Sequence, residues 1–266
     1  MISSLLSLVA RQANSKLRGM RKLPSNDSAG LANTSPSRRR VLRELILSLL
    51  LGAIVAIAIA FLITGIQPTA LLAALIFYIS GSLLAIQLFV QGFPHRQLGL
   101  GNLITIGRLV LVSALFSVVF GLVNPWLVIL ISVFALVLDG FDGFFARRAK
   151  KVSEFGARLD MEVDSALAAV LALSLWSSGL IGFEILLLAI PRYLFALATK
   201  IFPWMISPLP YSLARRVISV IQIASLIGLH APFLPEVLIT PVALIIIGLL
   251  IWSFGRDIIW LWRNRK

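Results

Sequence analysis

The chain has 266 residues, of which 59% are hydrophobic, and its formal net charge is +13. This composition is typical of a multi-span membrane protein and excludes an ordinary soluble domain. Because the chain contains no cysteine, it also excludes disulfides, thiolate metal sites and a cysteine nucleophile.

The first 43 residues differ in composition from the rest and are rich in Ser, Asn, Arg and Lys. Such polar segments favour disorder, so we expect residues 1–43 to form a basic cytoplasmic tail. A short apolar run, residues 2–10, leaves open a helix lying on the membrane surface or an organelle transit peptide.

The remaining chain is divided into apolar runs long enough to cross a bilayer, which takes about 20 residues. We therefore expect an all-α integral membrane protein in which two extra helices, within 44–92, precede the main domain. A basic cytoplasmic tail, 257–266, is expected to follow it. Turn-forming Gly, Pro and Asn separate about eight expected spans, near 44–65, 70–90, 102–123, 126–146, 157–177, 180–201, 213–230 and 238–256.

Lys and Arg are found at alternate connections between these spans. The positive-inside rule then predicts that both termini, and the loop 147–156, face the cytoplasm. A bacterial inner membrane is the expected location, and an organelle membrane stays open. The net positive charge is assigned to anchoring and to anionic headgroups, and no nucleic-acid partner is expected.

Four aspartates stand out because an acidic side chain inside a membrane span is costly and is a functional candidate by default. Asp139 and Asp142 are three residues apart, and Asp160 and Asp164 are four apart, so each pair shares a helix face. Such like charges repel unless a cation lies between them. Hard oxygen ligands predict Mg²⁺ or Mn²⁺, and two facing pairs could hold two ions.

The arrangement of these residues resembles the full signature of the CDP-alcohol phosphotransferase family. The matching stretch reads Asp139-x-x-Asp142-Gly143-x-x-Ala146-Arg147, followed by Gly156, Asp160 and Asp164. A second element, Asn102-x-x-Thr105-x-x-Arg108, is similar to the one that opens the first helix of this family's six-helix domain. The resemblance covers residues 100–256 and favours a phosphatidylglycerophosphate-synthase-like or related branch.

The resemblance implies transfer of a phosphatidyl or similar group from a CDP-linked alcohol to a hydroxyl acceptor, with release of CMP. It makes CDP-diacylglycerol the expected donor and a homodimer the expected assembly. It assigns metal binding to the four aspartates and the role of general base to Asp164. Contacts to the CDP-alcohol would come from Asn102, Thr105, Arg108, Gly143, Ala146, Arg147, Ser153 and Gly156.

The identity of the acceptor is expected to depend on basic residues outside this signature. Glycerol 3-phosphate is the expected acceptor, and inositol or its phosphate, serine and phosphatidylglycerol stay open. An anionic acceptor could be held by guanidinium groups, for which the candidates are Arg158, Arg192, Arg215 and Arg216. Arg192 could instead be a structurally paired charge, and Arg215 and Arg216 could serve only as membrane anchors.

Two readings without catalysis also stay open. Intramembrane carboxylates occur in cation transporters, although these tend to hold them near the bilayer midplane on discontinuous helices. A non-enzymatic cation-binding membrane protein is the other. Presence of the complete aspartate set favours the enzyme.

Overall fold

The computed structural model describes residues 36–93, 97–121, 123–148, 154–206 and 212–264, and this part of the chain contains helices and no strand. Side chains of residues 141–148 are not among those described. The eight α-helices of the described part are α2 (Pro36–Thr64), α3 (Pro68–Gly92), α4 (Leu100–Phe116), α5 (Pro125–Arg148), α6 (Glu154–Ser177), α7 (Ile190–Ile201), α8 (Leu213–Gly228) and α9 (Glu236–Arg263). Three short 3₁₀ helices accompany them: η1 (Ser117–Phe120), η2 (Phe183–Leu188) and η3 (Pro203–Ile206).

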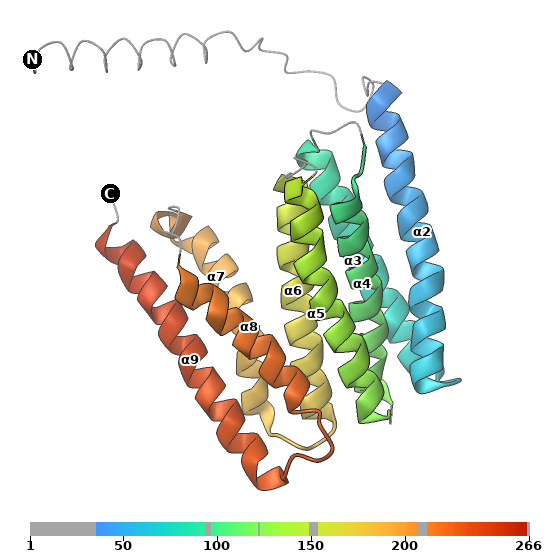
Figure 1. Ribbon diagram of the computed structural model, residues 1–266. Coiled ribbons are helices and arrows are strands. Elements are labelled where there is room, and N and C mark those ends of the chain that lie inside the picture. Colours follow the sequence, from blue (N-terminus) through green and yellow to red (C-terminus); the bar gives the residue numbers. More distant parts are fainter. Residues whose placement is uncertain (1–35, 94–96, 122, 149–153, 207–211, 265–266) are drawn as a thin grey trace, which may run out of the picture. The chain divides into compact units, whose positions relative to one another are not determined.

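Helix α4 packs against both α5 and α6, and these three helices contain the signature residues (Figure 1). Six of the ten buried residues of α6 recur every fourth position, which places these six along one face of the helix. They are Phe155, Leu159, Val163, Leu167, Leu171 and Leu175. This apolar stripe fixes the rotation of α6, and so it also fixes where the polar residues between its members point.

The N-terminal pair α2 and α3 is joined to α4 through small residues. The Tyr78 hydroxyl of α3 donates a hydrogen bond to the Leu49 carbonyl of α2 over 2.9 Å. A Cβ on Gly52 would lie 2.1 Å from that hydroxyl oxygen and 3.0 Å from a methyl carbon of Val110 on α4. Close approach of backbones at small residues is the usual way in which helices associate in membranes.

Among the described residues, four helices are long and apolar enough to cross a membrane: 38–64, 68–91, 100–120 and 237–263. Two shorter apolar helices lie at 125–140 and 217–228. Large apolar side chains on these helices point outward, as with Leu47, which is 65% exposed. The chain is therefore an all-α integral membrane protein, as the composition predicted.

The helix bounds differ from the expected boundaries at three places. The expected span 180–201 is divided into η2 and the 12-residue α7, which begins at Ile190 with Pro191 in its first turn, where the ring of a proline fits a helix. The tail expected at 257–266 is helical through Arg263, as part of α9. The N-terminal tail expected to reach residue 43 gives way to α2 at Pro36, and residues 1–35 lie outside the described residues.

Candidate active site

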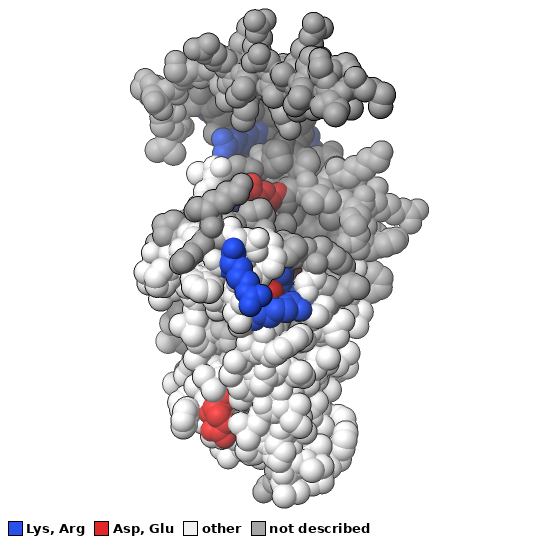
Figure 2. Space-filling view, turned by 90° about the vertical axis from the view of Figure 1, so that its left-hand side faces the viewer, with Lys and Arg blue, Asp and Glu red and all other residues white. Residues whose placement is uncertain are grey.

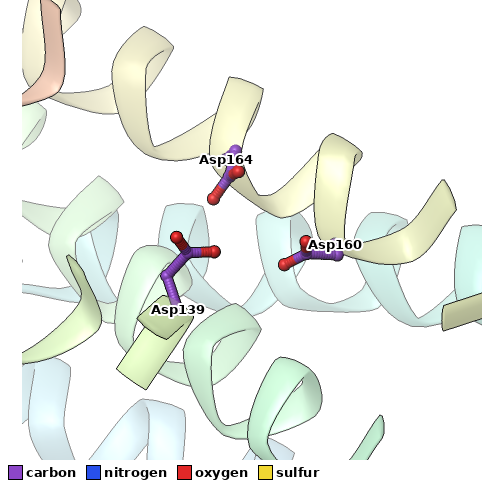
Figure 3. Close-up of side chains that lie close together, drawn as sticks. All are labelled: Asp139, Asp160 and Asp164. Atoms are coloured by element: carbon purple, nitrogen blue, oxygen red, sulfur yellow. The ribbon is translucent and has the colours of Figure 1, made fainter. Parts of the chain in front are cut away.

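Three of the four candidate aspartates converge. Asp139 extends from α5, and Asp160 and Asp164 extend from α6 toward it (Figure 3). One carboxylate oxygen from each residue lies within 4.8 Å of the others. The side chains are 33% to 36% exposed, so the carboxylates are accessible from outside the packed interior. The spacing predicted that Asp160 and Asp164 share a face of their helix, and their carboxylates do lie together; the matching prediction for Asp139 and Asp142 concerns a side chain outside those described.

The guanidinium of Arg108 on α4 contacts all three carboxylates. One terminal nitrogen lies 2.8 Å from an Asp139 oxygen and 2.5 Å from an Asp160 oxygen, and the other contacts Asp164. Its Nε donates to the Ala135 carbonyl over 3.2 Å. Arg108 is only 1% exposed, so these contacts also hold a buried charge that would be costly alone.

The three carboxylates suit a hard divalent cation. All the available donors are oxygens, which Mg²⁺ and Mn²⁺ prefer over softer ligands. Together with Arg108, the three carboxylates have a formal net charge of −2, since one guanidinium offsets one of the three negative charges. A cation of charge +2 would complete this balance, so the described residues fit the expected metal.

A cavity of about 480 Å³ opens beside this cluster, and Asp164 forms part of its wall. Volumes of this size are common for small-molecule sites. The cavity lies between α6, η2, α7, α8 and α9 and has both polar and apolar walls. Its polar lining consists of Asp164, Ser165, Arg192, Arg215, Ser219, Gln222, Ser253 and Asp257.

Comparison with known proteins agrees with this geometry. A family model described as CDP-alcohol phosphatidyltransferase matches residues 98–254, which is more than half of the chain. The chain belongs to the CDP-alcohol phosphatidyltransferase family. The matched range contains the three converging aspartates and Arg108, and it agrees with the range expected from the motifs.

Curated members of this family match over a shorter stretch. A CDP-diacylglycerol–glycerol-3-phosphate 3-phosphatidyltransferase from Pectobacterium atrosepticum is 43% identical over 77 residues, which make up 28% of this chain and 42% of that protein. Proteins with the same name from Yersinia pestis and Yersinia enterocolitica are 40% and 39% identical over 77 residues. The chain thus spans about two fifths of the length of these relatives. No solved structure matches it at a significant level.

The other signature residues are only partly described. Asp142, Gly143, Ala146 and Arg147 belong to α5, but their side chains lie outside those described. Ser153 lies outside the described residues altogether. Gly156 is in the first turn of α6, one helical turn before Asp160.

Asn102 and Thr105 are buried on α4 and bond to their own helix. The Asn102 amide donates to the Leu98 carbonyl, and the Thr105 hydroxyl donates to the Gly101 carbonyl over 3.1 Å. Both side chains are less than 10% exposed. Their expected contact with the CDP-alcohol is not tested by this arrangement and stays a prediction.

The four candidate acceptor residues fall in different settings. Arg192 and Arg215 line the cavity. An Arg192 terminal nitrogen lies 2.8 Å from a Glu162 carboxylate oxygen, so its partner in an ion pair is a glutamate of α6. Arg158 is 51% exposed, pairs with Glu154 and does not line the cavity. The side chain of Arg216 lies outside those described.

Sequence reasoning missed Asp257. This residue is 7% exposed on α9, lines the cavity and pairs with Arg215. It falls in the segment 257–266, for which the sequence predicts a basic cytoplasmic tail. The one available signal was that it is an isolated acid in a strongly basic segment.

Proposed function

We propose that this protein transfers the phosphatidyl group of CDP-diacylglycerol to glycerol 3-phosphate and releases CMP. The observation that carries the proposal is the convergence of three carboxylates on neighbouring helices, with Asp164 also lining a cavity. A diphosphate donor and a hydroxyl acceptor could therefore meet at one carboxylate. The names of the curated relatives support the choice of donor and acceptor.

The reaction is a displacement at phosphorus. The acceptor hydroxyl oxygen forms a bond to the phosphorus that carries diacylglycerol, and the bond from that phosphorus to the bridging oxygen of the diphosphate breaks. CMP leaves with this oxygen. Asp164 accepts the hydroxyl proton as general base and later passes it to water, a role that requires a carboxylate within reach of the acceptor. Its position on the cavity wall supports this assignment.

Asp139, Asp160 and Asp164 would hold a divalent cation, Mg²⁺ or Mn²⁺, and Asp142 completes the proposed set for two ions. When bound, such cations draw charge from a diphosphate and stabilise the departing phosphate oxygens. The chain itself contributes the geometry, because α5 and α6 bring the carboxylates together before a substrate arrives.

The donor site is proposed to include the residues implied by the family signature. Arg108 places a positive charge beside the carboxylates, where the donor diphosphate would lie. Gly156 exposes backbone one turn above Asp160, so a nucleotide could approach closely. Asn102, Thr105, Gly143, Ala146, Arg147 and Ser153 complete the proposed CDP-alcohol site.

The acceptor is proposed to occupy the cavity beside Asp164. Arg192 and Arg215 supply guanidinium groups, which suit the phosphate of glycerol 3-phosphate. Ser165, Ser219 and Gln222 supply polar groups for its hydroxyls. Arg158 and Arg216 are retained only as residues of the cytoplasmic approach to the site.

The protein is proposed to act in a bacterial inner membrane, as a homodimer, with its active site and both termini facing the cytoplasm. The Lys and Arg distribution supports this orientation. Membrane lipids surround the apolar helices and supply the donor.

The test is CMP release by the purified full-length protein in lipid nanodiscs that contain CDP-diacylglycerol. We expect CMP and labelled phosphatidylglycerol phosphate to form with glycerol 3-phosphate and Mg²⁺. Chelation of the metal should abolish both. Asp164→Asn should lower kcat by about a thousandfold, because loss of a general base costs 10²–10⁴ and a ligand is lost too.

A matched control is Glu184→Gln, which also converts a carboxylate to an amide but lies in η2, beyond the opposite end of α6 from Asp164. It should leave CMP release unchanged. No turnover with glycerol 3-phosphate, inositol, inositol phosphate, serine or phosphatidylglycerol would refute the enzyme and favour a cation-binding protein or transporter. Turnover with another acceptor of this series, but not with glycerol 3-phosphate, would refute only the proposed identity of the acceptor and leave the proposed reaction in place.

A further inference from the structure

The cavity lining includes a buried carboxylate on α9 that the proposed reaction does not use. Asp257 of α9 is 7% exposed and contacts two arginines, Arg215 of α8 and Arg256 of α9. An Arg215 Nε lies 2.7 Å from one of its oxygens, and an Arg256 terminal nitrogen lies 3.3 Å from the other. A carboxylate so buried needs such partners, because an unpaired one would be costly.

These contacts also fix the start of α8. Ser212 caps this helix, and its hydroxyl oxygen accepts from the backbone N–H of Arg215 over 3.4 Å. The same oxygen accepts from Arg256 over 2.8 Å. Arg215 is therefore held at both its backbone and its side chain, in the first turn of α8.

Arg215 connects the cluster of Arg215, Arg256 and Asp257 with the proposed acceptor site, because it lines the cavity. Arg215 and Asp257 line the same cavity as Asp164, whereas Arg256 does not. Asp257 engages Arg215 through Nε while the same arginine lines the cavity. Holding a guanidinium in one orientation lowers the entropy lost when it binds an anion.

The charges of the cluster favour an anionic ligand. Two guanidinium groups contact a single carboxylate, so Arg215, Arg256 and Asp257 have a formal net charge of +1. By contrast, Arg192 and Glu162 at another part of the cavity balance each other. A phosphorylated acceptor would thus gain more from the Arg215 end of the cavity than a neutral alcohol would.

We propose that Asp257 is a positioning residue that orients the Arg215 guanidinium to bind the phosphate of the acceptor. The inference rests on the proposed function, since it concerns the acceptor half of that reaction. A purely structural role, in which the ion pair only ties α8 to α9, predicts different kinetics. Loss of a contact that only ties α8 to α9 would change the KM values for both substrates and the melting temperature together.

The test compares Asp257→Asn and the wild-type chain in nanodiscs. The amide can still accept from one arginine but has lost its charge. We expect the KM for glycerol 3-phosphate to rise about tenfold, which equals about 1.4 kcal/mol. The KM for CDP-diacylglycerol and kcat should each stay within about twofold, because the donor site and Asp164 are untouched.

A second measurement does not depend on turnover. Equilibrium binding of labelled glycerol 3-phosphate to the full-length protein should weaken by the same factor in Asp257→Asn. Asp257→Glu keeps the charge but lengthens the side chain by one methylene. Its affinity for glycerol 3-phosphate should lie between those of the wild type and Asp257→Asn. Combining Asp257→Asn with Arg215→Gln should add little to the effect of Arg215→Gln alone, because the two act as a unit.

The outcomes separate the two hypotheses. If the wild-type protein binds glycerol 3-phosphate but does not turn it over, and Asp257→Asn weakens that binding, the proposed function fails and the positioning role stands. If Asp257→Asn leaves the affinity unchanged, or if the wild-type protein does not bind glycerol 3-phosphate, the positioning role is overturned. Parallel changes in both KM values and in melting temperature, shared by Asp257→Glu, would also overturn it in favour of a structural tie.

Discussion

Arg108 offsets the repulsion between the three carboxylates that it contacts. Two unit charges 4 Å apart interact by about 4 kcal/mol at the effective dielectric found near protein surfaces. Asp139, Asp160 and Asp164 would therefore repel one another strongly if nothing lay between them. The Arg108 guanidinium contacts all three, so a permanent positive charge keeps the carboxylates close in the absence of metal.

A prediction follows from the contact of one guanidinium with three carboxylates. Arg108→Met removes the guanidinium but keeps a long apolar side chain, and it should lower the free energy of unfolding in chelator by about 3 kcal/mol. Added Mg²⁺ should then raise the melting temperature of the variant more than that of the wild type, because the cation replaces the lost charge. The measurement is thermal unfolding in detergent with and without Mg²⁺.

Arg158→Met is the matched control for this experiment. It removes the same group from an exposed ion pair with Glu154, and such pairs contribute about 0–1 kcal/mol. Its response to Mg²⁺ should equal that of the wild type. An Arg108→Met protein as stable as the wild type in chelator would contradict the role given to Arg108.

The N-terminal pair of helices acts on the site through packing. Gly81 of α3 lies against Leu109, the residue that follows Arg108 on α4, and Leu109 is 3% exposed. A Cβ on Gly81 would lie 2.6 Å from a Leu109 methyl carbon. Contact this close fixes the rotation of α4, and with it the direction in which Arg108 points.

Gly81→Leu is therefore predicted to disturb the site from a distance. Overpacking at a helix contact costs about 1–3 kcal/mol, and here the added side chain must push Leu109 away. We expect a lower melting temperature together with slower CMP release. Gly248→Leu on α9 is the control, because a Cβ added at Gly248 would meet no atom of another part of the protein within 4 Å. This variant should change neither the melting temperature nor the rate of CMP release. Equal loss in both variants would show that any larger residue in these helices is harmful, and would remove the argument for Gly81.

Periodicity predicted the helices well but did not predict where two of them break or end. The apolar content of 180–201 matched a span, and hydropathy alone does not register that Pro191 can only begin a helix. Spacing likewise predicted that Asp160 and Asp164 share a face of their helix. It could not predict that Arg108 would contact them, or that Asp257 pairs with Arg215 42 positions away, because both depend on how separate helices pack.

The site residues lie at comparable depths from one end of their helices. Asp160 and Asp164 follow the start of α6 by six and ten residues, or about 9 and 15 Å at 1.5 Å per residue. Asp139 precedes the end of α5 by nine residues, or about 14 Å. If these helix ends lie at a membrane surface, we expect the site to lie between that surface and the midplane, where the headgroup of the proposed lipid donor could reach it while the acyl chains stay in the bilayer.

The side of the membrane that this end faces can be tested with the natural absence of cysteine from the chain. Gln97 and Ser178 are exposed residues on connections separated by α4, α5 and α6. In intact bacterial cells, a membrane-impermeant maleimide should label Ser178→Cys. Gln97→Cys should react only after the cells are permeabilised, because three helices crossing the bilayer place the two positions on opposite sides and the basic residues hold the Gln97 side in the cytoplasm. Labelling of Gln97→Cys alone in intact cells would reverse the proposed orientation, and labelling of both would contradict the three crossings. Helix α6 begins on the Gln97 side. Labelling of Ser178→Cys alone in intact cells would therefore place Asp160 and Asp164 within reach of a water-soluble cytoplasmic acceptor.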